Sequence, residues 1–516
     1  MKKKKIKQIG KKFFTGLMMF SVMPMLVFAA PSKPPTGTGN GGTPPSGSNQ
    51  GGAPGSSSSS VTHTGASTIS ENSTLSNKTY SSTTGGENAL LVSGGTSTIN
   101  DITVNKTGDE SSENSDFYGT NAAIFAYNDA VLTLKGGKIT TNASHANGVF
   151  AYGNSTINIS DATINTTGNN SGGVMVTGGG TLNATNLTVK TTGNSAASIR
   201  SDRGGGNLTV KGGTYETTGT GSPAIYSTAN IKVSNATLTS TSSEGVVVEG
   251  ANSVTLNNVK LTDTNNTLNG NSQTYKNIFL YQSMSGDADE GNASFTAKDS
   301  TITTNKGDTI FVTNTTATIN LENNTIVNND GDFLRIQTGA WGTSGSNGGN
   351  VTLNMTNQKV SGNVIVDSIS TLSMSLKDKS VLVGSIDLDN QAKKVDLTLS
   401  SDSVLSLTAD TYVDSLTNED SSNSNIYSNG KYKLYVDGKE VSINKATYKE
   451  SEVTTTTTLK NEIKETKNNN IIYITCIIGT IIILGAVTII IFKKKKNKEN
   501  YNEKDDVEIV KWLKPL

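Results

Sequence analysis

Two neighbouring stretches, STINISDATINTTG (Ser155–Gly168) and GTLNATNLTVKTTG (Gly180–Gly193), align without a gap. In each, apolar and polar residues alternate around an apolar anchor, Ile157 or Leu182, and a second anchor follows seven residues later. An alternation with a period of two predicts a β-strand with one buried face. Gly, Asn and Asp between the short strands supply the positive φ angles and local hydrogen bonds of tight turns.

The same pair of anchors recurs along the middle of the chain. The pairs are Leu132/Ile139, Ile157/Ile164, Leu182/Val189, Leu208/Tyr215, Ile231/Leu238, Val254/Leu261, Phe295/Ile302, Ile319/Ile326 and Leu353/Val360. Their first members are separated by 25, 25, 26, 23, 23, 41, 24 and 34 residues, and the two long intervals contain insertions. Such a period predicts a solenoid in which each coil of three short strands pairs with the next at ~4.8 Å. About a dozen coils would form a rod roughly 60 Å long.

The pattern between the strands narrows the fold class. No amphipathic helical window separates the strands, which excludes βαβ units. Antiparallel hairpins are a weaker alternative, because the period fits one three-strand coil. We therefore expect an all-β chain, a single-stranded right-handed parallel β-helix, followed by a C-terminal transmembrane helix.

The coils resemble a known group of proteins. The recurring pattern of a Gly-Val or Gly-Ile start, a T-[IL]-N-[IA] strand and a T-T-G end is similar to the right-handed parallel β-helices of the pectin-lyase-like superfamily. The resemblance is strongest to bacterial surface proteins of the adhesin-like and autotransporter-passenger type, over about residues 67–410. It implies a β-helical rod outside the cell. The chain departs from autotransporters in ending with an apolar segment where those proteins have a translocator barrel.

Segments at both ends predict where the protein resides. A basic start and an apolar run from Phe13 to Phe28 predict a signal peptide, and the uncharged run from Ile471 to Phe492 is long enough to span a membrane. Lysines 493–496 follow it, so the C-terminus should be cytoplasmic. The expected segments are a signal peptide (1–29), a Pro/Gly/Ser-rich disordered linker (30–66), the β-helix repeats (67–410), a C-terminal β capping segment with a hairpin at Asp437-Gly438 (411–449), a Thr/Lys/Asn-rich stalk (450–470), the membrane span (471–492) and a basic tail (493–516).

Composition excludes several classes of function. The 43 basic and 43 acidic residues balance, so no basic field is available to attract nucleic acid. The single cysteine, Cys476, excludes an intrachain disulfide and a cysteine-based zinc site.

Few residues suited to catalysis occur in the repeats. His63 and His145 are the only histidines, and we expect His145 to be solvated in a turn. The charged cluster Arg200, Asp202 and Arg203 is explained by a surface ion pair. Asp287 and Asp289 in the loop GDADEGN could offer oxygen ligands to Ca²⁺, but the loop lacks EF-hand spacing and an ordinary acidic loop is favoured. We therefore expect no enzyme, no cofactor and no metal site.

One phase of the repeat carries aromatic residues. Tyr127, Tyr152, Thr177, Arg203, Tyr226 and Glu249 each lie five residues before an anchor. In a solenoid an equal phase becomes a spatial column. If the column faces outward, Tyr127, Tyr152, Arg203 and Tyr226 form the predicted ligand-binding site; if it faces inward, the tyrosines are structural. Phe125, Phe150 and Met175 each lie two residues before the first three members of this set, and we expect them in the core. The alternative location for binding is the insertions at Asn265–Lys276 and Ala340–Asn350.

These expectations combine into a function. The sequence predicts a membrane-anchored, adhesin-like surface protein that binds an extracellular glycan or protein. A passive structural or shielding component of the envelope is the second class, and a polysaccharide lyase or hydrolase is the third. The ligand, the oligomeric state and wall attachment stay open at this level.

Overall fold

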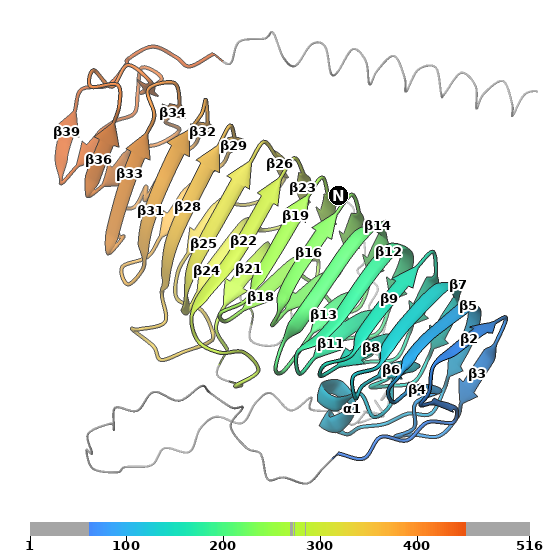
Figure 1. The fold of residues 1–516 in the computed structure, drawn as a ribbon. Helices are drawn as coiled ribbons and strands as arrows, with labels where there is room; N and C mark the ends of the chain where they lie inside the picture. The colour runs from blue at the N-terminus through green and yellow to red at the C-terminus, as the bar shows by residue number, and fades with distance from the viewer. Residues whose placement is uncertain (1–60, 269–271, 273, 284, 450–516) are drawn as a thin grey trace, which may run out of the picture. The chain divides into compact units, whose positions relative to one another are not determined.

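The protein is a parallel β-solenoid, and its successive coils lie side by side along one axis (Figure 1). The computed structural model describes residues 61–449 except 269–271, 273 and 284. The chain divides into two units, Met1–Thr447 and Tyr448–Leu516, and the solenoid belongs to the first. Among the described residues no helix is long and apolar enough to cross a membrane. The predicted signal peptide, most of the linker, the stalk, the membrane span and the tail all lie outside the described residues.

One side of the solenoid is a sheet of twelve parallel strands from twelve successive coils. In order along the sheet, the strands are β1 (Thr68–Ile69), β4 (Leu90–Val92), β6 (Ile124–Ala126), β8 (Val149–Tyr152), β11 (Val174–Thr177), β13 (Ile199–Ser201), β15 (Ile225–Ser227), β18 (Val246–Glu249), β21 (Lys276–Tyr281), β24 (Asp308–Thr313), β27 (Leu334–Ile336) and β30 (Val364–Val366). We call it the twelve-stranded sheet.

A second sheet, of twenty strands, forms the remaining sides. Its strands are β2 (Ser73–Ser76), β3 (Thr79–Ser82), β5 (Thr96–Lys106), β7 (Val131–Thr141), β9 (Thr156–Ser160), β10 (Thr163–Thr166), β12 (Gly180–Thr191), β14 (Gly206–Thr217), β16 (Asn230–Ser234), β17 (Thr237–Ser240), β19 (Ser253–Asn257), β20 (Lys260–Asp263), β22 (Asn292–Lys298), β23 (Thr301–Thr304), β25 (Thr315–Glu322), β26 (Thr325–Asn328), β28 (Gly349–Thr356), β31 (Thr371–Lys377), β33 (Lys394–Leu399) and β36 (Ser415–Asn418). Long strands bend through both sides: β12 pairs with β9 through its first half and with β10 through its second half.

Two small sheets and one helix complete the described structure. The sheets contain β29 (Lys359–Ser361), β32 (Val381–Val383), β34 (Val404–Ser406) and β37 (Ile426–Tyr427), and β35 (Thr411–Val413), β38 (Leu434–Val436) and β39 (Lys439–Val441). The helix is α1 (Glu113–Tyr118). The pair β38–β39 is antiparallel and turns at Asp437-Gly438, as predicted. However, β35 still pairs in parallel with β38, so parallel pairing continues past residue 410, into the segment predicted to be only a cap.

The anchor residues stack as the repeat predicts. Each first anchor from Leu132 to Leu353 is the register partner of the next one, across both long insertions. All of these side chains are buried in one apolar cluster that fills the interior. The insertions therefore leave the stack undisturbed and emerge from its corners.

A residue with left-handed backbone marks the corner between the two arms of the twenty-stranded sheet, and in the last two coils of the series the corner between that sheet and the four-stranded sheet. In successive coils this residue has φ between 46° and 72° and is Asn77, Asp101, Gly136, Asp161, Asn186, Gly212, Asn235, Asn258, Asp299, Asn323, Asn357 or Asp378. Asn, Asp and Gly adopt this conformation most readily. Several of the side chains also bond along the axis, for example Asn258 Nδ2 to Asn235 Oδ1 at 2.7 Å.

The T-T-G motif closes several coils at another corner. In two of them its first threonine is buried and donates to a carbonyl of the following turn: Thr166 Oγ1 donates to Ser171 O at 2.6 Å and Thr191 Oγ1 to Ala196 O at 2.5 Å. Its glycine permits close contact between coils, because a Cβ on Gly193 would lie 1.9 Å from the carbonyl oxygen of Gly168. The motif thus satisfies a buried corner with a hydroxyl donor and removes the side chain that would push the coils apart.

Replacing Ile157 with Asp should lower the free energy of unfolding by at least ~3 kcal/mol, because Ile157 is fully buried and a carboxylate there has no partner. Thr156→Asp, one residue earlier on the outer side of the same strand, should lower it by less than ~1 kcal/mol. Urea unfolding followed by circular dichroism measures both. Equal losses for the two variants would contradict the observed register.

The corner predicts a second pair of variants. Asn186, with φ of 52°, should tolerate Gly within ~0.5 kcal/mol, whereas Asn186→Val should cost ~1–2 kcal/mol because a β-branched residue resists left-handed backbone. The same unfolding measurement compares them. If the Val variant matched the Gly variant in stability, the corner would not depend on the left-handed conformation.

Candidate functional site

The outer side of the twelve-stranded sheet differs in chemistry from the rest of the surface. Elsewhere Thr, Ser, Asn and Lys face outward, but here one column of register partners is mostly large. The column contains Leu91, Phe125, Phe150, Met175, Arg200, Tyr226, Val247, Phe279, Phe311, Arg335 and Ile365. We call it the outer column. It has an aromatic cluster towards each end and charged groups between them.

The first aromatic cluster is covered by the chain itself. Phe125, Phe150 and Met175 are buried as expected, but outside the solenoid interior. The cover includes α1, where a Cβ on Gly119, the C-cap residue, would lie 2.1 Å from the Phe125 ring. It also includes His63, whose ring centroid lies 4.7 Å from that of Phe125. The chain therefore covers Phe125, Phe150 and Met175, and it leaves Tyr127 and Tyr152, at the margin of this cluster, partly accessible.

Ion pairs follow in the middle of the outer column. Arg200 binds Asp202 at 3.0 Å, and burial raises the pKa of Asp202 to about 6. Arg203 binds Asp287 at 2.5 Å and lies 3.8 Å over the ring of Phe117. Arg203 therefore ties α1 to the loop that follows β21.

A buried carboxylate without a cation lies beside these ion pairs. Glu249 is 1% exposed and accepts hydrogen bonds from Tyr226 at 2.5 Å, from Tyr281 at 2.8 Å and from Ser283. Burial, and then the charge of Glu249, raise the pKa of both tyrosines. The three hydroxyl donors satisfy the carboxylate, so Glu249 fixes the tyrosines in place.

The predicted site residues do not form one column. Tyr127 and Tyr152 lie together, at 4.6 Å and 6.2 Å from the His63 ring, and both are half-buried. Arg203 lies in a turn after β13, and Tyr226 is the register partner of Arg200. The structure thus brings the first pair together and separates Arg203 and Tyr226 from it.

Variable turn length explains the difference. The predicted phase was counted backwards from each anchor across the turn that joins the twelve-stranded sheet to the next strand. Met175, Arg200 and Tyr226 are register partners, but their anchors Leu182, Leu208 and Ile231 follow 7, 8 and 5 residues later. An equal count therefore reaches different positions in different coils.

Other sequence predictions can also be placed. His145 is not solvated as expected: its Nδ1 lies 2.8 Å from Asp116 Oδ2 of α1. Asp287 is committed to Arg203. No group of three or more metal-ligating side chains occurs within the described parts of the chain.

The second aromatic cluster lies beneath the insertions. Phe279, Tyr281 and Phe311 are almost fully buried, and Trp341 from the loop after β27 packs on them, with ring centroids 5.5 Å from Phe279 and 5.0 Å from Tyr281. Hydrogen bonds from Asn347 also hold the backbone of this loop in place. Asn347 is buried and donates to Gly339 O at 3.0 Å and to Trp341 O at 2.8 Å.

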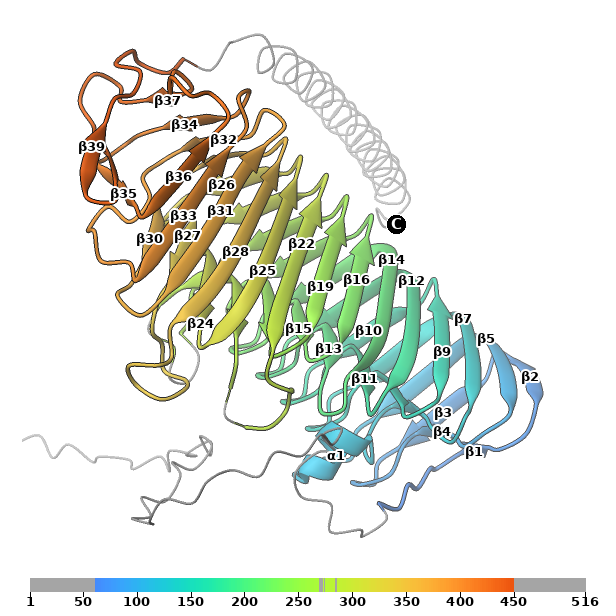
Figure 2. The same cartoon turned by 60° about the vertical axis from the view of Figure 1, so that its left-hand side comes forward.

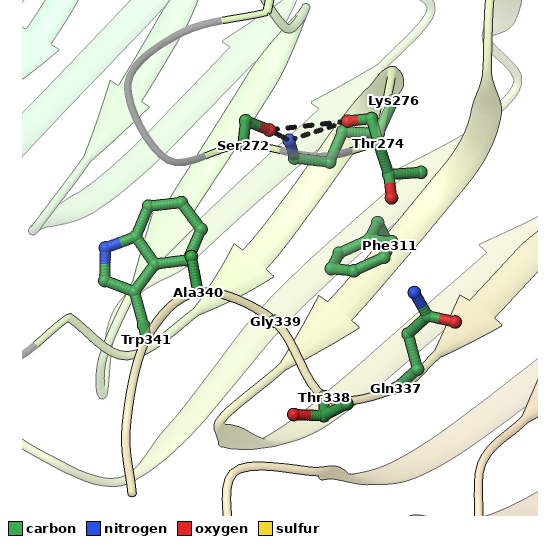
Figure 3. Close-up of a pocket in the computed structure, with 9 residues that line it drawn as sticks. All are labelled: Ser272, Thr274, Lys276, Phe311, Gln337, Thr338, Gly339, Ala340 and Trp341. Atoms are coloured by element: carbon green, nitrogen blue, oxygen red, sulfur yellow. Dashed lines mark hydrogen bonds between the residues drawn. The ribbon is translucent and has the colours of Figure 1, made fainter. Parts of the chain in front are cut away.

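A hollow opens beside Trp341. Three parts of the chain line it: Ser272, Thr274 and Lys276; Phe311 of β24; and residues 337–341. Figure 3 shows Trp341 on one side, Phe311 and Gln337 on the other, and Lys276 with Ser272 along a third. The sequence pointed to the two insertions as alternative binding segments, but it gave no sign that Trp341 and Lys276, far apart in sequence, meet.

The lysine in the hollow is fully engaged. Lys276 Nζ contacts Glu244 Oε1 at 3.0 Å, Ser272 Oγ at 2.5 Å and Thr274 O at 3.1 Å. It also lies 4.4 Å from the centroid of the Phe279 ring. Its charge is neutralised and its N–H groups are used, so the hollow presents no free cation at this position.

A buried acid lies near the same lysine. Asp263 occupies the position that is Thr191, Thr217 or Ser240 in earlier coils. Burial, and then the charge of Glu244, raise its pKa to about 9. Its Oδ2 has no hydrogen-bond partner in the described part of the chain. Asp263 is therefore protonated in the folded protein at neutral pH.

Replacing Asp263 with Thr should raise the free energy of unfolding, by at least ~1 kcal/mol more at pH 8 than at pH 5. The unfolded acid loses its proton near its ordinary pKa of 3.8, whereas the folded acid keeps it up to about 9, so the native state loses stability as the pH rises between these values. Urea unfolding at both pH values measures the gain. Ser240→Thr, in the same column, is the control and should show no such pH dependence. A gain for Asp263→Thr that is equal at both pH values would contradict the assignment.

Comparison with known proteins gives no match: no family model fits the chain, and no curated protein and no solved structure is significantly similar. The function has to be inferred from the residues of the site.

Proposed function

We propose that the protein is a membrane-anchored, adhesin-like surface protein that binds an extracellular glycan or protein through the outer side of the twelve-stranded sheet. Its solenoid is then a right-handed β-helix of the pectin-lyase-like kind. The signal peptide at 1–29 and the span at 471–492 place the repeats outside the cell, with the basic tail in the cytoplasm. This address rests on the sequence patterns at the two ends of the chain.

The placement of the insertions is the observation that carries the proposal. Four long connecting segments adjoin strands of the twelve-stranded sheet. Residues 107–123, which contain α1, precede β6, and residues 264–275 precede β21. Residues 282–291 follow β21, and residues 337–348 follow β27. Figures 1 and 2 show α1 and the loop 337–348 on the same side of the solenoid. The corner at the left-handed residues carries no insertion from Asn77 to Asp378. Loops that collect around one sheet support a binding surface there.

The carboxylates of this surface support binding in preference to hydrolysis. Asp202 is paired with Arg200, Asp287 with Arg203, and Glu249 with three hydroxyl groups. A glycosidase needs two carboxyl groups facing a shared space for the sugar. The three acids are instead engaged with protein groups that hold the loops and tyrosines in place.

Adhesion tests the proposal. Cells displaying the full chain should bind an array of glycans and matrix proteins in a ligand-dependent manner. The triple variant Tyr127→Ser, Tyr152→Ser and Arg203→Ser should weaken adhesion by about tenfold or more, because many weak contacts act together. Tyr226 is left unchanged because its hydroxyl satisfies Glu249.

A matched control uses the other sheet. Thr133, Thr209 and Thr255 face outward from the twenty-stranded sheet, and changing them to Ser should leave adhesion unchanged. If the triple variant still adheres as the parent does, binding does not depend on Tyr127, Tyr152 and Arg203. A parent chain that binds nothing on the array would instead indicate a passive envelope component.

A further inference from the structure

We propose that the hollow beside Trp341 binds one neutral glycosyl unit of an extracellular glycan, with the indole ring of Trp341 as its stacking surface. The inference rests on the proposed function, because the ligand must be outside the cell. It assigns the ligand class and a site that is separate from Tyr127 and Tyr152.

The first argument is the way in which Trp341 is presented. Its ring is only half-buried, although Phe279 and Tyr281 support it from the sheet. Asn347 fixes the loop through the carbonyls of Gly339 and Trp341, and it accepts a hydrogen bond from Thr338 Oγ1 at 2.8 Å. An indole held in this way offers a flat apolar surface without a large loss of conformational entropy on binding. The C–H groups on one side of a pyranose ring match such a surface.

The second argument is a polar side chain left open in the hollow. Among the described residues, the side-chain amide of Gln337 has no hydrogen-bond partner. Figure 3 shows this amide beside Phe311, across the hollow from Trp341. An amide both donates and accepts, so it can bond hydroxyl groups of a sugar that stacks on the indole ring.

The third argument is charge. Lys276 is neutralised by Glu244, and nearby Arg335 binds Asp308 at 2.6 Å and Asp332 at 2.5 Å. An acidic sugar would find no free cation among the described residues that line the hollow. A neutral sugar needs no cation for binding, so the charge pattern favours a neutral sugar over an acidic one.

The size of the hollow suits contact with a single sugar unit. Its empty space is about 300 Å³ with the open mouth included. The lining residues therefore contact one face of one pyranose ring, and the rest of the glycan extends through the mouth into solvent.

The experiment uses the fluorescence of Trp341 in the full chain. The chain contains two tryptophans, so Trp512→Phe leaves Trp341 as the single indole reporter. Methyl glycosides of glucose, galactose and N-acetylglucosamine are titrated, with methyl glucuronide as the acidic comparison. At least one neutral glycoside should change the emission saturably, and the glucuronide should bind about tenfold more weakly or worse, a difference of ~1.4 kcal/mol.

Two further variants make the outcome decisive. Gln337→Ala should weaken binding about fivefold or more, whereas Thr343→Ala, exposed on the same loop, should leave it unchanged. No saturable change with any neutral glycoside, or equal binding by the Gln337→Ala variant, overturns the assignment. If no glycoside binds and Trp341→Ala abolishes adhesion to a protein on the array, the hollow is a protein contact and the sugar assignment is wrong, while the proposed function stands. A parent chain that adheres to nothing overturns the proposed function itself.

Discussion

The fold depends on one residue per coil that must adopt a left-handed backbone. From Asn77 to Asp378 this residue turns the chain sharply enough for two strands to share one sheet, and it recurs at the same register in each coil. Because this residue recurs at the same register, the strands on either side stay in phase and their apolar side chains meet inside. The stacking of Ile157 on Leu182 and Leu208 is a consequence of that fixed corner.

The sequence predicted the features of the fold that depend on a fixed number of residues between equivalent positions. The anchors, the alternation within strands and the hairpin at Asp437-Gly438 all involve short distances along the chain, over which a count of residues equals a position in space. The outer column could not be predicted in the same way, because the turns that join the twelve-stranded sheet to the next strand vary in length. Tyr226 was therefore placed next to Arg203 in the predicted column, although its register partner is Arg200.

The candidate site depends on contacts that no repeat encodes. Trp341 meets Phe279 because a loop folds back across the sheet, and Arg203 meets Asp287 although 84 positions separate them. The sequence marked the loops by their length alone. It predicted that Phe125 is buried, but not that Phe125 lies outside the solenoid interior, where His63 and α1 cover it.

The direction of the hydrogen bonds between coils has a mechanical consequence. These bonds run along the solenoid axis, so a pull along that axis acts on the ladders in series, and the coils separate successively from the loaded ends. A force applied between Trp341 and the C-terminal end passes only through the coils from β28 onward. The coils before β27 carry no load in that geometry, so they keep their structure whatever tension the C-terminal coils sustain. The antiparallel pair β38–β39 is the first set of hydrogen bonds to bear the force.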